Sequence, residues 1–548
     1  MPDEAMPDED KMNLGKIYHM GKEEAAGLLL NRQAMASHTF ITGSTGTGKS
    51  NAVYHLLDEI TKNGQTTFLV VEPAKGEYKN VFGNCTDAQV FGTNPRETPL
   101  LRMNPFAFPE NIHILEHIDR LVEIFNACWP MYAAMPAVLK DAIERSYQKV
   151  GWDLRNSESE KGIFPTFFDL LDILPGVIEE SHYSKDTQSD YVGALCTRVK
   201  SLTNGIYGSV LCAEDALSDA EMFDQNVIVD LSRVGSMETK SLLMGILVMK
   251  LQEYRMCSSG MNSRLRHVTV LEEAHNLLRK TSAEQSQEGA NLQGKSVEML
   301  ANAIAEMRTY GEGFIIADQA PGLLDMSVIR NTNTKIILRL PDEEDRKLVG
   351  KSAALKEAQI DELSKLPLGV AAVYQNEWPE AVLCKIEAYP MPENAVYHKP
   401  SKMPHEINAE FVFGQLAVGK ELKPLSSSEM EQLKLWLKRH ETVLKPEDSR
   451  YLERVFAGGE LDVAKTRKAV FDFFGGIGTV VDYCAAAKKS LTPRKEFLEQ
   501  LQGQYGLKAA AADWVLNSVI SMGMSLNPDA KAVDNLRTNF EQQGGRVL

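Results

Sequence analysis

The stretch at residues 38–60, HTFITGSTGTGKSNAVYHLLDEI, decides the fold of this chain. It begins with a short apolar run, passes through a glycine-rich turn and continues with apolar residues at helical spacing from Ala52 to Ile60. The turn, Gly43 to Ser50, fully matches the pattern G-x-x-x-x-G-K-S/T, and it stands between a predicted strand and a predicted helix. The stretch therefore predicts a phosphate-binding loop within a βαβ unit of a parallel sheet.

Each residue type in this loop suits phosphate binding. Glycines let the backbone curl, so that successive amides and the positive end of the helix point at phosphate oxygens. Lys49 would neutralise the β and γ phosphates, and Ser50 would ligate magnesium. A bare glycine-rich turn is the alternative, but it leaves the strand, the spacing and the Lys-Ser pair unexplained. We predict ATP and Mg²⁺ as cofactors, held by Gly43, Ser44, Thr45, Gly46, Thr47, Gly48, Lys49, Ser50 and Asn51.

A second motif, HVTVLEEAH at residues 267–275, is an apolar strand that ends in two adjacent carboxylates. It is typical of a Walker B strand. Glu272 would support the magnesium ion, and Glu273 would orient or deprotonate the attacking water. Aspartate is more usual on the magnesium side, so whether Glu272 coordinates directly or through water stays open. The alternative is a solvated acid pair at the end of a strand.

His275 follows these carboxylates, but the segment is not a zinc-protease motif. Such a motif needs two histidines four residues apart on a helix, whereas here a single histidine follows a predicted strand. We therefore expect His275 to be structural or to contact the site indirectly.

A polar residue, Gln319, follows another apolar strand, FIIAD at residues 314–318. It is either an ordinary cap or a sensor of the γ phosphate. Because ligands gather at the carboxyl ends of parallel strands, we expect Lys49, Glu273 and Gln319 to converge there.

The rest of the chain predicts an α/β fold with a mostly parallel sheet. A helical insertion is expected at about residues 106–205, between strands at 66–71 and 227–231. Further strands are predicted at residues 38–41, 267–271, 313–317, 335–340 and 369–374. The predicted domains are a disordered lead-in (1–13), an ATPase domain (14–395) and a C-terminal helical region (405–548) after a proline-rich linker.

Composition limits the class of protein. Of the 548 residues, 43% are apolar and 24% are charged, as in ordinary folded proteins rather than disordered or fibrous ones. The 59 basic and 75 acidic residues give a net charge of −16, so any contact with nucleic acid must be local, as in a channel. The seven cysteines show no zinc-ligand spacing, and no apolar run reaches the ~18 residues of a membrane span. We expect a cytoplasmic protein.

Two further stretches, together with the nucleotide motifs, resemble a known family. EPAKGEY at residues 72–78 is similar to the acid-then-Gly-Glu-Tyr signature of HerA, and EMRTYG at residues 306–311 leads into the strand before Gln319. Over roughly residues 14–390 the chain resembles the HerA/FtsK branch of RecA-type ATPases, and HerA most of all. The resemblance implies a RecA-like P-loop NTPase core and hexameric rings that hydrolyse ATP between subunits and thread duplex DNA through the centre.

The resemblance also suggests residues that act between subunits. Arg308 is the candidate for an arginine finger in the neighbouring active site, and Arg339 is a rival for that role. Glu77 stays unassigned, because its spacing from Glu72 differs from the HerA pattern. HerA proteins usually carry an N-terminal β-barrel, whereas only 42 residues precede Gly43 here, so docking surfaces of that barrel are not expected.

The candidate DNA contact is the polar stretch from Arg279 to Lys295, which includes Lys280. A motor that tracks the phosphate backbone needs few basic groups in each subunit, because a hexameric ring repeats every one of them. The alternative is a solvated loop whose charge is incidental.

The leading hypothesis is an ATP-driven, HerA-like hexameric DNA translocase or helicase motor that works with a separate effector. The sequence shows no other catalytic constellation, so the chain is expected to cut nothing by itself. By the resemblance, the effector is a nuclease or a sirtuin-like NADase, in DNA repair or anti-phage defence. Its contact would lie near residues 28–30 or on the C-terminal helices, unless ordinary core packing explains both. An ATPase scaffold that activates an effector with little translocation is the alternative, and a secretion or conjugation ATPase is disfavoured because nothing suggests a membrane anchor.

Overall fold

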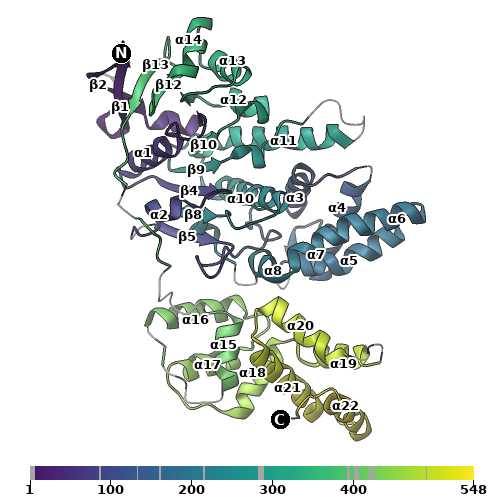
Figure 1. The fold of residues 1–548 in the computed structure, drawn as a ribbon. Helices are drawn as coiled ribbons and strands as arrows, with labels where there is room; N and C mark the ends of the chain where they lie inside the picture. Colours follow the sequence, from purple (N-terminus) through teal and green to yellow (C-terminus); the bar gives the residue numbers. More distant parts are fainter. Residues whose placement is uncertain are drawn as a thin grey trace. The chain divides into compact units, whose positions relative to one another are not determined.

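The protein was studied as a computed structural model (Figure 1). It describes residues 6–85, 88–132, 134–159, 162–213, 216–281, 289–391, 395–399, 407–418, 422, 424–425, 427–488, 490 and 492–547. The chain forms two compact units. Unit 1 comprises Met1–Leu101, Pro105–Val199 and Leu217–Lys399, and unit 2 comprises Arg102–Asn104, Lys200–Ala216 and Pro400–Leu548.

Unit 1 is built on an eleven-stranded sheet in the order β2-β1-β13-β12-β11-β3-β10-β9-β4-β8-β5. The strands from β11 to β5 are parallel, and β12, β13, β1 and β2 pair antiparallel at one side. Their bounds are β1 Lys11–His19, β2 Lys22–Asn31, β3 Thr39–Thr42, β4 Thr67–Glu72, β5 Ala88–Gly92, β8 Asn226–Asp230, β9 His267–Glu272, β10 Glu312–Asp318, β11 Thr334–Ile337, β12 Val370–Gln375 and β13 Val382–Ile386. The predicted α/β class with a mostly parallel sheet is confirmed.

The order of the central strands decides which loops meet. β3, which leads into the glycine-rich loop, pairs with β10, and β10 pairs in turn with β9. The strand that ends in Glu272 is therefore separated from the phosphate-loop strand by the strand that ends in Asp318. Because the three strands are parallel, the residues that follow them gather at one edge of the sheet.

Helices cover both faces of this sheet. On one face lie α1 (Lys49–Thr61) and α2 (Tyr78–Phe82), whose buried side chains share a core with the strands. On the other lie α10 (Met237–Ser258), α11 (Gly289–Glu306) and α3 (Ile114–Cys128) (Figure 1). Buried residues occur on every side of α10, as expected for a helix that lies between a sheet and other helices.

Of the remaining helices, α4 to α7 lie in the region predicted as a helical insertion, and α9, α12, α13 and α14 lie outside it. α4 packs against α5, whose first turn is fixed by a capping box between Thr166 and Asp169. A short hairpin of β6 (Trp152–Asp153) and β7 (Glu158–Ser159) joins these two helices. The bounds are α4 Met135–Lys149, α5 Phe167–Glu180, α6 Lys185–Tyr191, α7 Thr197–Thr203, α9 Asp219–Phe223, α12 Met326–Arg330, α13 Glu343–Ser352 and α14 Glu357–Glu362.

The N-terminal hairpin differs from the sequence-based expectation. Residues 1–13 were predicted to be a disordered lead-in, yet Asp8–Asp10 form a 3-10 turn and β1 begins at Lys11. Asp10 is buried and accepts a hydrogen bond of 2.9 Å from Arg264, which ties this end to the sheet. Leu28 and Leu30, weighed above as a partner surface, belong to the core beneath α1.

All regular secondary structure in the described residues of unit 2 is helical. Its helices are α8 Gly205–Leu211, α15 Ala409–Val418, α16 Ser427–Arg439, α17 Pro446–Phe456, α18 Val463–Phe473, α19 Gly476–Ala486, α20 Pro493–Tyr505, α21 Ala509–Leu526 and α22 Ala530–Gln542. In the part of the chain that the structure describes, no single helix is long and apolar enough to cross a membrane. The pair α18 and α19 passes that test jointly, but it is bent by 70° and contributes side chains to the core of unit 2.

Candidate nucleotide-binding and hydrolysis site

The glycine-rich loop has the conformation that phosphate binding requires. Gly46 and Gly48 have φ values of 76° and 104°, in the left-handed region where side chains are disfavoured. At Gly43 the need is for space, because a Cβ there would lie 2.7 Å from Cβ of Leu338. The backbone N–H of Ser44 donates to the carbonyl of Arg339 at 3.0 Å. The loop is therefore fixed on β11 before any ligand binds.

A pocket opens over this loop. Its walls include a cation, Lys75, that is absent from the predicted site, and Leu368 from the turn before β12. The other lining residues are Ser44, Thr45, Gly46, Gly48, Lys49, Ser50, Asn51 and Gln319. Seven of the nine residues predicted to hold the nucleotide therefore line one shared cavity, and Gly43 and Thr47 do not.

Glu273 is the centre of a polar network beside the pocket. Lys49 Nζ lies 3.4 Å from its Oε1, and Gln319 Nε2 donates to the same oxygen. Thr45 Oγ1 donates to Oε1 of Gln319 at 2.6 Å, which connects the network to the phosphate loop. The structure thus brings Lys49, Glu273 and Gln319 together, and their catalytic roles stay predictions.

The backbone of Glu273 is strained. Its φ and ψ are 45° and 51°, the left-handed conformation that non-glycine residues rarely adopt. Such strain persists only where the surroundings hold it, and it clusters at functional sites. The turn aims the carboxylate into the pocket region instead of continuing the line of β9.

Glu272, the other acid of the pair, is nearly buried. Tyr78 Oη donates to its Oε1 at 2.6 Å, and a second small pocket brings it together with Ser50. Burial raises the pKa of Glu272, although Lys49 and Tyr78 oppose the shift. Its carboxylate and the Ser50 hydroxyl are hard oxygen donors of the kind that Mg²⁺ prefers, so these two residues fit the predicted ion.

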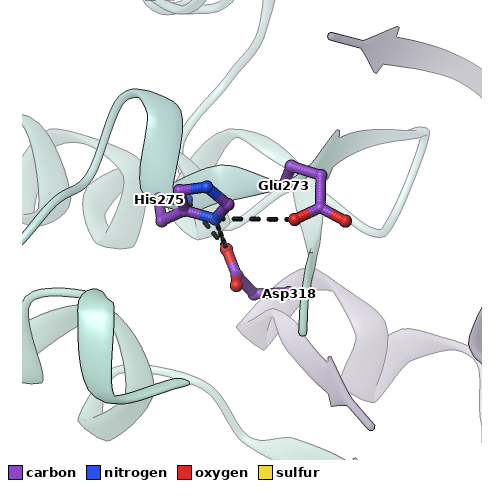
Figure 2. Close-up of side chains that lie close together, drawn as sticks. All are labelled: Glu273, His275 and Asp318. Carbon is purple, nitrogen blue, oxygen red and sulfur yellow. Dashed lines mark hydrogen bonds and ion pairs between the residues drawn. The ribbon is translucent and has the colours of Figure 1, made fainter. Parts of the chain in front are cut away.

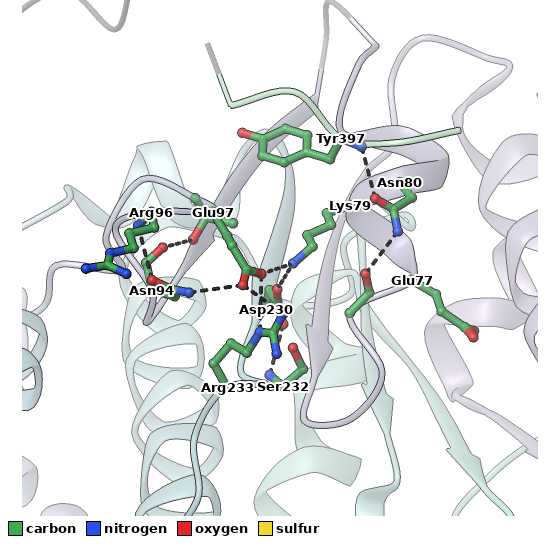
Figure 3. Close-up of polar contacts among 12 residues, drawn as sticks. Glu77, Lys79, Asn80, Asn94, Arg96, Glu97, Asp230, Ser232, Arg233 and Tyr397 are labelled. Carbon is green, nitrogen blue, oxygen red and sulfur yellow. Dashed lines mark hydrogen bonds and ion pairs between the residues drawn. The ribbon is translucent and has the colours of Figure 1, made fainter. Parts of the chain in front are cut away.

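The 72–78 stretch forms the far wall of this second pocket. Glu72 accepts hydrogen bonds from the backbone N–H groups of Glu77 (2.7 Å) and Tyr78 (3.1 Å), and burial raises its pKa to about 8. Figure 3 shows how the following helix is held, since Lys79 donates to Asp230 at 2.6 Å and contacts Glu97 at 3.0 Å. The hydrogen bonds to Glu72 therefore hold the HerA-like signature in a conformation in which Tyr78 contacts Glu272.

His275 and Asp318 lie behind Glu273 (Figure 2). His275 Nδ1 is 2.9 Å from Oδ2 of Asp318 and 3.5 Å from Oε2 of Glu273. The three side chains offer ligand atoms within 4.8 Å of one another, but Asp318 already accepts two backbone N–H groups besides the ring. The arrangement is therefore complete as a hydrogen-bonded network without a metal ion.

Asn51, predicted as part of the cofactor site, lines the pocket but commits its side chain elsewhere. Its Nδ2 donates to the carbonyl of Glu387 at 3.0 Å, and its Oδ1 accepts from the N–H of Tyr389 at 2.9 Å. Both polar atoms thus anchor the segment after β13 on the first turn of α1.

The two arginines lie at opposite edges of the sheet. Arg308 is exposed in a 3-10 turn (Met307–Tyr310) before β10, at the amino ends of the strands and so away from its own phosphate loop. Arg339 is exposed after β11, where its carbonyl holds Ser44. Of the two, only Arg308 is placed where it cannot act within its own subunit.

The predicted DNA stretch is described in part. Arg279 and Lys280 are exposed, and their backbone pairs with residues 323–324, the turn after β10. Lys295 is exposed on α11, and residues 282–288 lie outside the described part of the chain. The basic groups thus begin only four residues after the turn that contains His275.

Sequence reasoning missed Asp318, Tyr78 and Lys75 as parts of the site. The signal for Asp318 was its place at the end of β10, one residue before Gln319. Tyr78 and Lys75 stand in the HerA-like signature, but nothing in the pattern says that a tyrosine there reaches a carboxylate 194 residues away.

Comparisons with known proteins agree with this geometry. Residues 12–251 match the family model described as the central domain of helicase HerA. A probable helicase of Methanocaldococcus jannaschii is 23% identical over 414 residues, covering 69% of this chain and 72% of that protein. The DNA double-strand break repair helicase HerA of Sulfolobus acidocaldarius is 25% identical over 392 residues, covering 69% of each chain. The chain is a P-loop ATPase that is similar to the HerA family over residues 12–251.

The fold of this HerA-like ATPase is also found among solved structures. VirB4 of Thermoanaerobacter pseudethanolicus superposes with a TM-score of 0.53 at 17% identity, covering 70% of this chain and 98% of that one. This likeness confirms the predicted fold, whereas the family model and the two relatives confirm the predicted resemblance to HerA and the ATPase class. The segment that matches the HerA family model ends inside α10, before the Walker B strand. The roles predicted for Glu272, Glu273 and Gln319 therefore rest on the geometry described above.

Proposed function

We propose that this HerA-like ATPase is a DNA translocase or helicase-type motor that hydrolyses ATP between the subunits of a homohexamer. The observation that carries the proposal is the network of Thr45, Gln319, Glu273 and Lys49, which connects the pocket over the phosphate loop to the smaller pocket that Glu273 lines. It places a phosphate-binding cation, an acid that can activate water and an amide that can sense the γ phosphate within contact of one another. This is the minimum set for phosphoryl transfer to water.

Ser50 and Glu272 would hold the magnesium ion, which supplies charge neutralisation at the phosphates when bound. Lys49 then leaves Glu273 for the β and γ phosphates. This exchange frees one carboxylate oxygen of Glu273 to orient or deprotonate water. In the structure, Lys49 Nζ and Glu273 Oε1 are 3.4 Å apart and form an ion pair.

A ring explains the position of Arg308. Because it is exposed at the edge opposite its own phosphate loop, it can complete only a neighbouring site. Mixing subunits tests this. Arg308→Ala and Glu273→Gln proteins, each inactive alone, should regain partial turnover in mixed rings, since one interface then has both groups intact. If mixtures that exchange subunits stay inactive, Arg308 is not the trans group, and Arg339→Ala is tested in the same way.

DNA would be contacted by Arg279, Lys280 and Lys295, repeated around the ring. Arg279 and Lys280 lie in the loop after β9, where their backbone pairs with the turn after β10. This loop follows the turn of Glu273, so DNA contact and hydrolysis would share one structural element. That proximity favours the motor over the alternative, a scaffold in which ATP binding activates an effector with little translocation.

The deciding experiment is ATP turnover with and without duplex DNA across a salt series. Alanine at Arg279, Lys280 and Lys295 together should weaken DNA binding and flatten its salt dependence, because each lost phosphate contact releases fewer counterions. Basal turnover should survive. The matched control removes the same charge from unit 2, at Lys495, Lys508 and Lys531, which are exposed on or beside its helices.

Two outcomes separate the candidate functions. DNA stimulation that is lost in the triple variant but kept in the control supports the motor. Turnover that DNA never stimulates supports the scaffold. In either case we propose a separate effector, a nuclease or a sirtuin-like NADase, in repair or anti-phage defence. The purified chain, free of co-purifying protein, should then hydrolyse ATP but leave plasmid DNA and NAD intact, and cleavage that follows this chain through size exclusion would contradict that.

A further inference from the structure

Asp318, the last residue of β10, is a fully buried carboxylate, and both of its oxygens make hydrogen bonds. Its Oδ2 accepts the backbone N–H of His275 at 2.8 Å and the ring Nδ1 at 2.9 Å, and its Oδ1 accepts the N–H of Ala320 at 2.9 Å. A buried carboxylate is costly unless hydrogen bonds compensate it. These bonds tie the end of β10 to the turn after β9.

That turn contains the strained Glu273. Its left-handed backbone conformation is unfavourable for a residue with a side chain and has to be held by its surroundings. Asn276 donates to the carbonyl of Glu273 from its backbone N–H (2.9 Å) and from Nδ2 (2.7 Å), which closes the turn from within. The two hydrogen bonds of His275 with Asp318 fix the turn to β10, together with the bond from Gln319 to Glu273.

The imidazole of His275 faces the second oxygen of Glu273. Its Nδ1 lies 3.5 Å from Oε2 (Figure 2). Gln319 and Lys49 contact the other oxygen, Oε1. The hydrogen bond to Asp318 raises the pKa of His275, and nearby Arg279 opposes the shift. The charged groups that face the ring are thus Glu273, Asp318 and Arg279.

We propose that Asp318 and His275 are positioning residues that aim Glu273 at the attacking water. Asp318 fixes the turn and the ring, and the ring supports Oε2. Gln319, the next residue on the same strand end, supports Oε1. When the phosphates draw Lys49 away, these two side chains remain to hold the carboxylate. The inference rests on the proposed catalytic role of Glu273.

The test uses four variants of the full-length chain: His275→Ala, His275→Asn, Asp318→Asn and, as a matched control, His267→Gln. His267 forms a pair with Glu312 on the same two strands, but at their amino ends. Turnover, the affinity for a fluorescent ATP analogue and the unfolding midpoint are measured for each. Asparagine retains an N–H near the position of Nδ1, so it separates loss of the hydrogen bond from loss of the ring.

We expect kcat to fall about 100-fold in His275→Ala and Asp318→Asn, because a misplacement of about 1 Å costs that much, while nucleotide affinity changes less than threefold. His275→Asn should recover part of the loss. It should also lack a step in the pH profile of kcat above pH 6.5, where wild-type His275 loses its proton. His267→Gln should lower the unfolding midpoint but not kcat per folded molecule.

The outcomes distinguish this inference from the function on which it rests. If Glu273→Gln keeps near-normal turnover, the catalytic assignment itself fails. If Glu273→Gln is inactive but His275→Ala keeps wild-type kcat and pH profile, positioning is overturned. An equal fall in kcat for His267→Gln also overturns it, because the effect would then be general. Should Asp318→Asn not fold, the His275 variants decide. The His275 side chain is 23% exposed, and after its removal Asp318 still accepts the backbone N–H groups of residue 275 and Ala320.

Discussion

Strands β9 and β10 are bridged by a histidine–carboxylate pair at each end, and the two pairs have different surroundings. At the amino ends, His267 Nδ1 is 2.8 Å from Glu312, and at the carboxyl ends His275 Nδ1 is 2.9 Å from Asp318. Residue types, strands and distances are alike. The difference lies in what surrounds each pair.

The amino-end pair, His267 and Glu312, is buried among other protein side chains. Glu312 also accepts hydrogen bonds from Arg255 at 2.8 Å and Thr269 at 2.8 Å, and all four side chains are buried. Burial opposes its charge, but His267 and Arg255 lower the pKa of Glu312 to about 2. At the carboxyl end, by contrast, His275 is partly exposed and faces Glu273, which lies in a strained turn beside a pocket. A buried charge cluster indicates function only where some of its bonding capacity is directed at a cavity.

The largest effects are expected from substituting Lys49 and Glu273, which lie at the centre of the network at the carboxyl ends of the strands. Lys49→Ala should abolish nucleotide binding or turnover, because it removes the cation of the phosphate loop. Glu273→Gln should keep ATP bound and lower kcat by about 10²–10⁴-fold, the usual size of a general-base contribution. Binding of a fluorescent ATP analogue and phosphate release measure the two effects. Near-normal turnover in Glu273→Gln would remove that residue from catalysis.

Substituting Glu312, in the pair at the amino ends of the strands, should lower the free energy of unfolding instead. Glu312→Ala leaves Arg255 and His267 without their shared carboxylate, and loss of one partner of a buried pair costs about 3–5 kcal/mol. The free energy of unfolding in urea should fall by that amount, with kcat per folded molecule unchanged at a temperature where the variant is folded. A fall in kcat with unchanged stability would show that the amino end takes part in turnover.

The sequence predicted the local half of this contrast. The glycines of the phosphate loop, its Lys-Ser pair and the two acids after β9 are patterns of neighbouring residues, so the loop and seven of the strands of the main sheet could be predicted. The hairpin of β1 and β2 could not, because the first six residues of β2 are exposed and its apolar residues fall at its end. The role of Asp318 depends on a contact across 43 residues, which no spacing rule encodes.

The two histidines should have opposite effects on the pH dependence of stability. Asp318 raises the pKa of His275, so its stabilising contribution is complete below pH 6.5 and is lost as pH rises through the higher folded value. Burial lowers the pKa of His267, so that pair loses stability as pH falls below 6.5. Unfolding midpoints of His275→Asn and His267→Asn, each subtracted from wild type between pH 5 and pH 8, should therefore have slopes of opposite sign. Parallel slopes would mean that the surroundings of the two pairs do not differ in the way described here.

The smallest effect is expected at Asn51, which shares the carboxyl edge with Glu273 but, like the amino-end pair, directs its hydrogen bonds at neighbouring protein groups. Its side chain makes two hydrogen bonds, to the carbonyl of Glu387 and from the N–H of Tyr389, so it has little capacity left for a phosphate. Asn51→Ala should lower the free energy of unfolding by about 1–3 kcal/mol for the two bonds together, with ATP affinity changed less than threefold.

Asn80→Ala is the matched control for Asn51→Ala. Asn80 Oδ1 accepts the N–H of Tyr397 at 2.9 Å, so its side chain holds the same C-terminal part of unit 1 at a point outside the phosphate loop. Similar losses of stability in the two variants, with ATP affinity retained in both, would assign Asn51 to anchoring this segment. A tenfold loss of ATP affinity in Asn51→Ala alone would instead place its side chain in the nucleotide site. Side-chain hydrogen bonds to the neighbouring backbone, such as those of Asn51, would then no longer separate structural from functional residues at this edge.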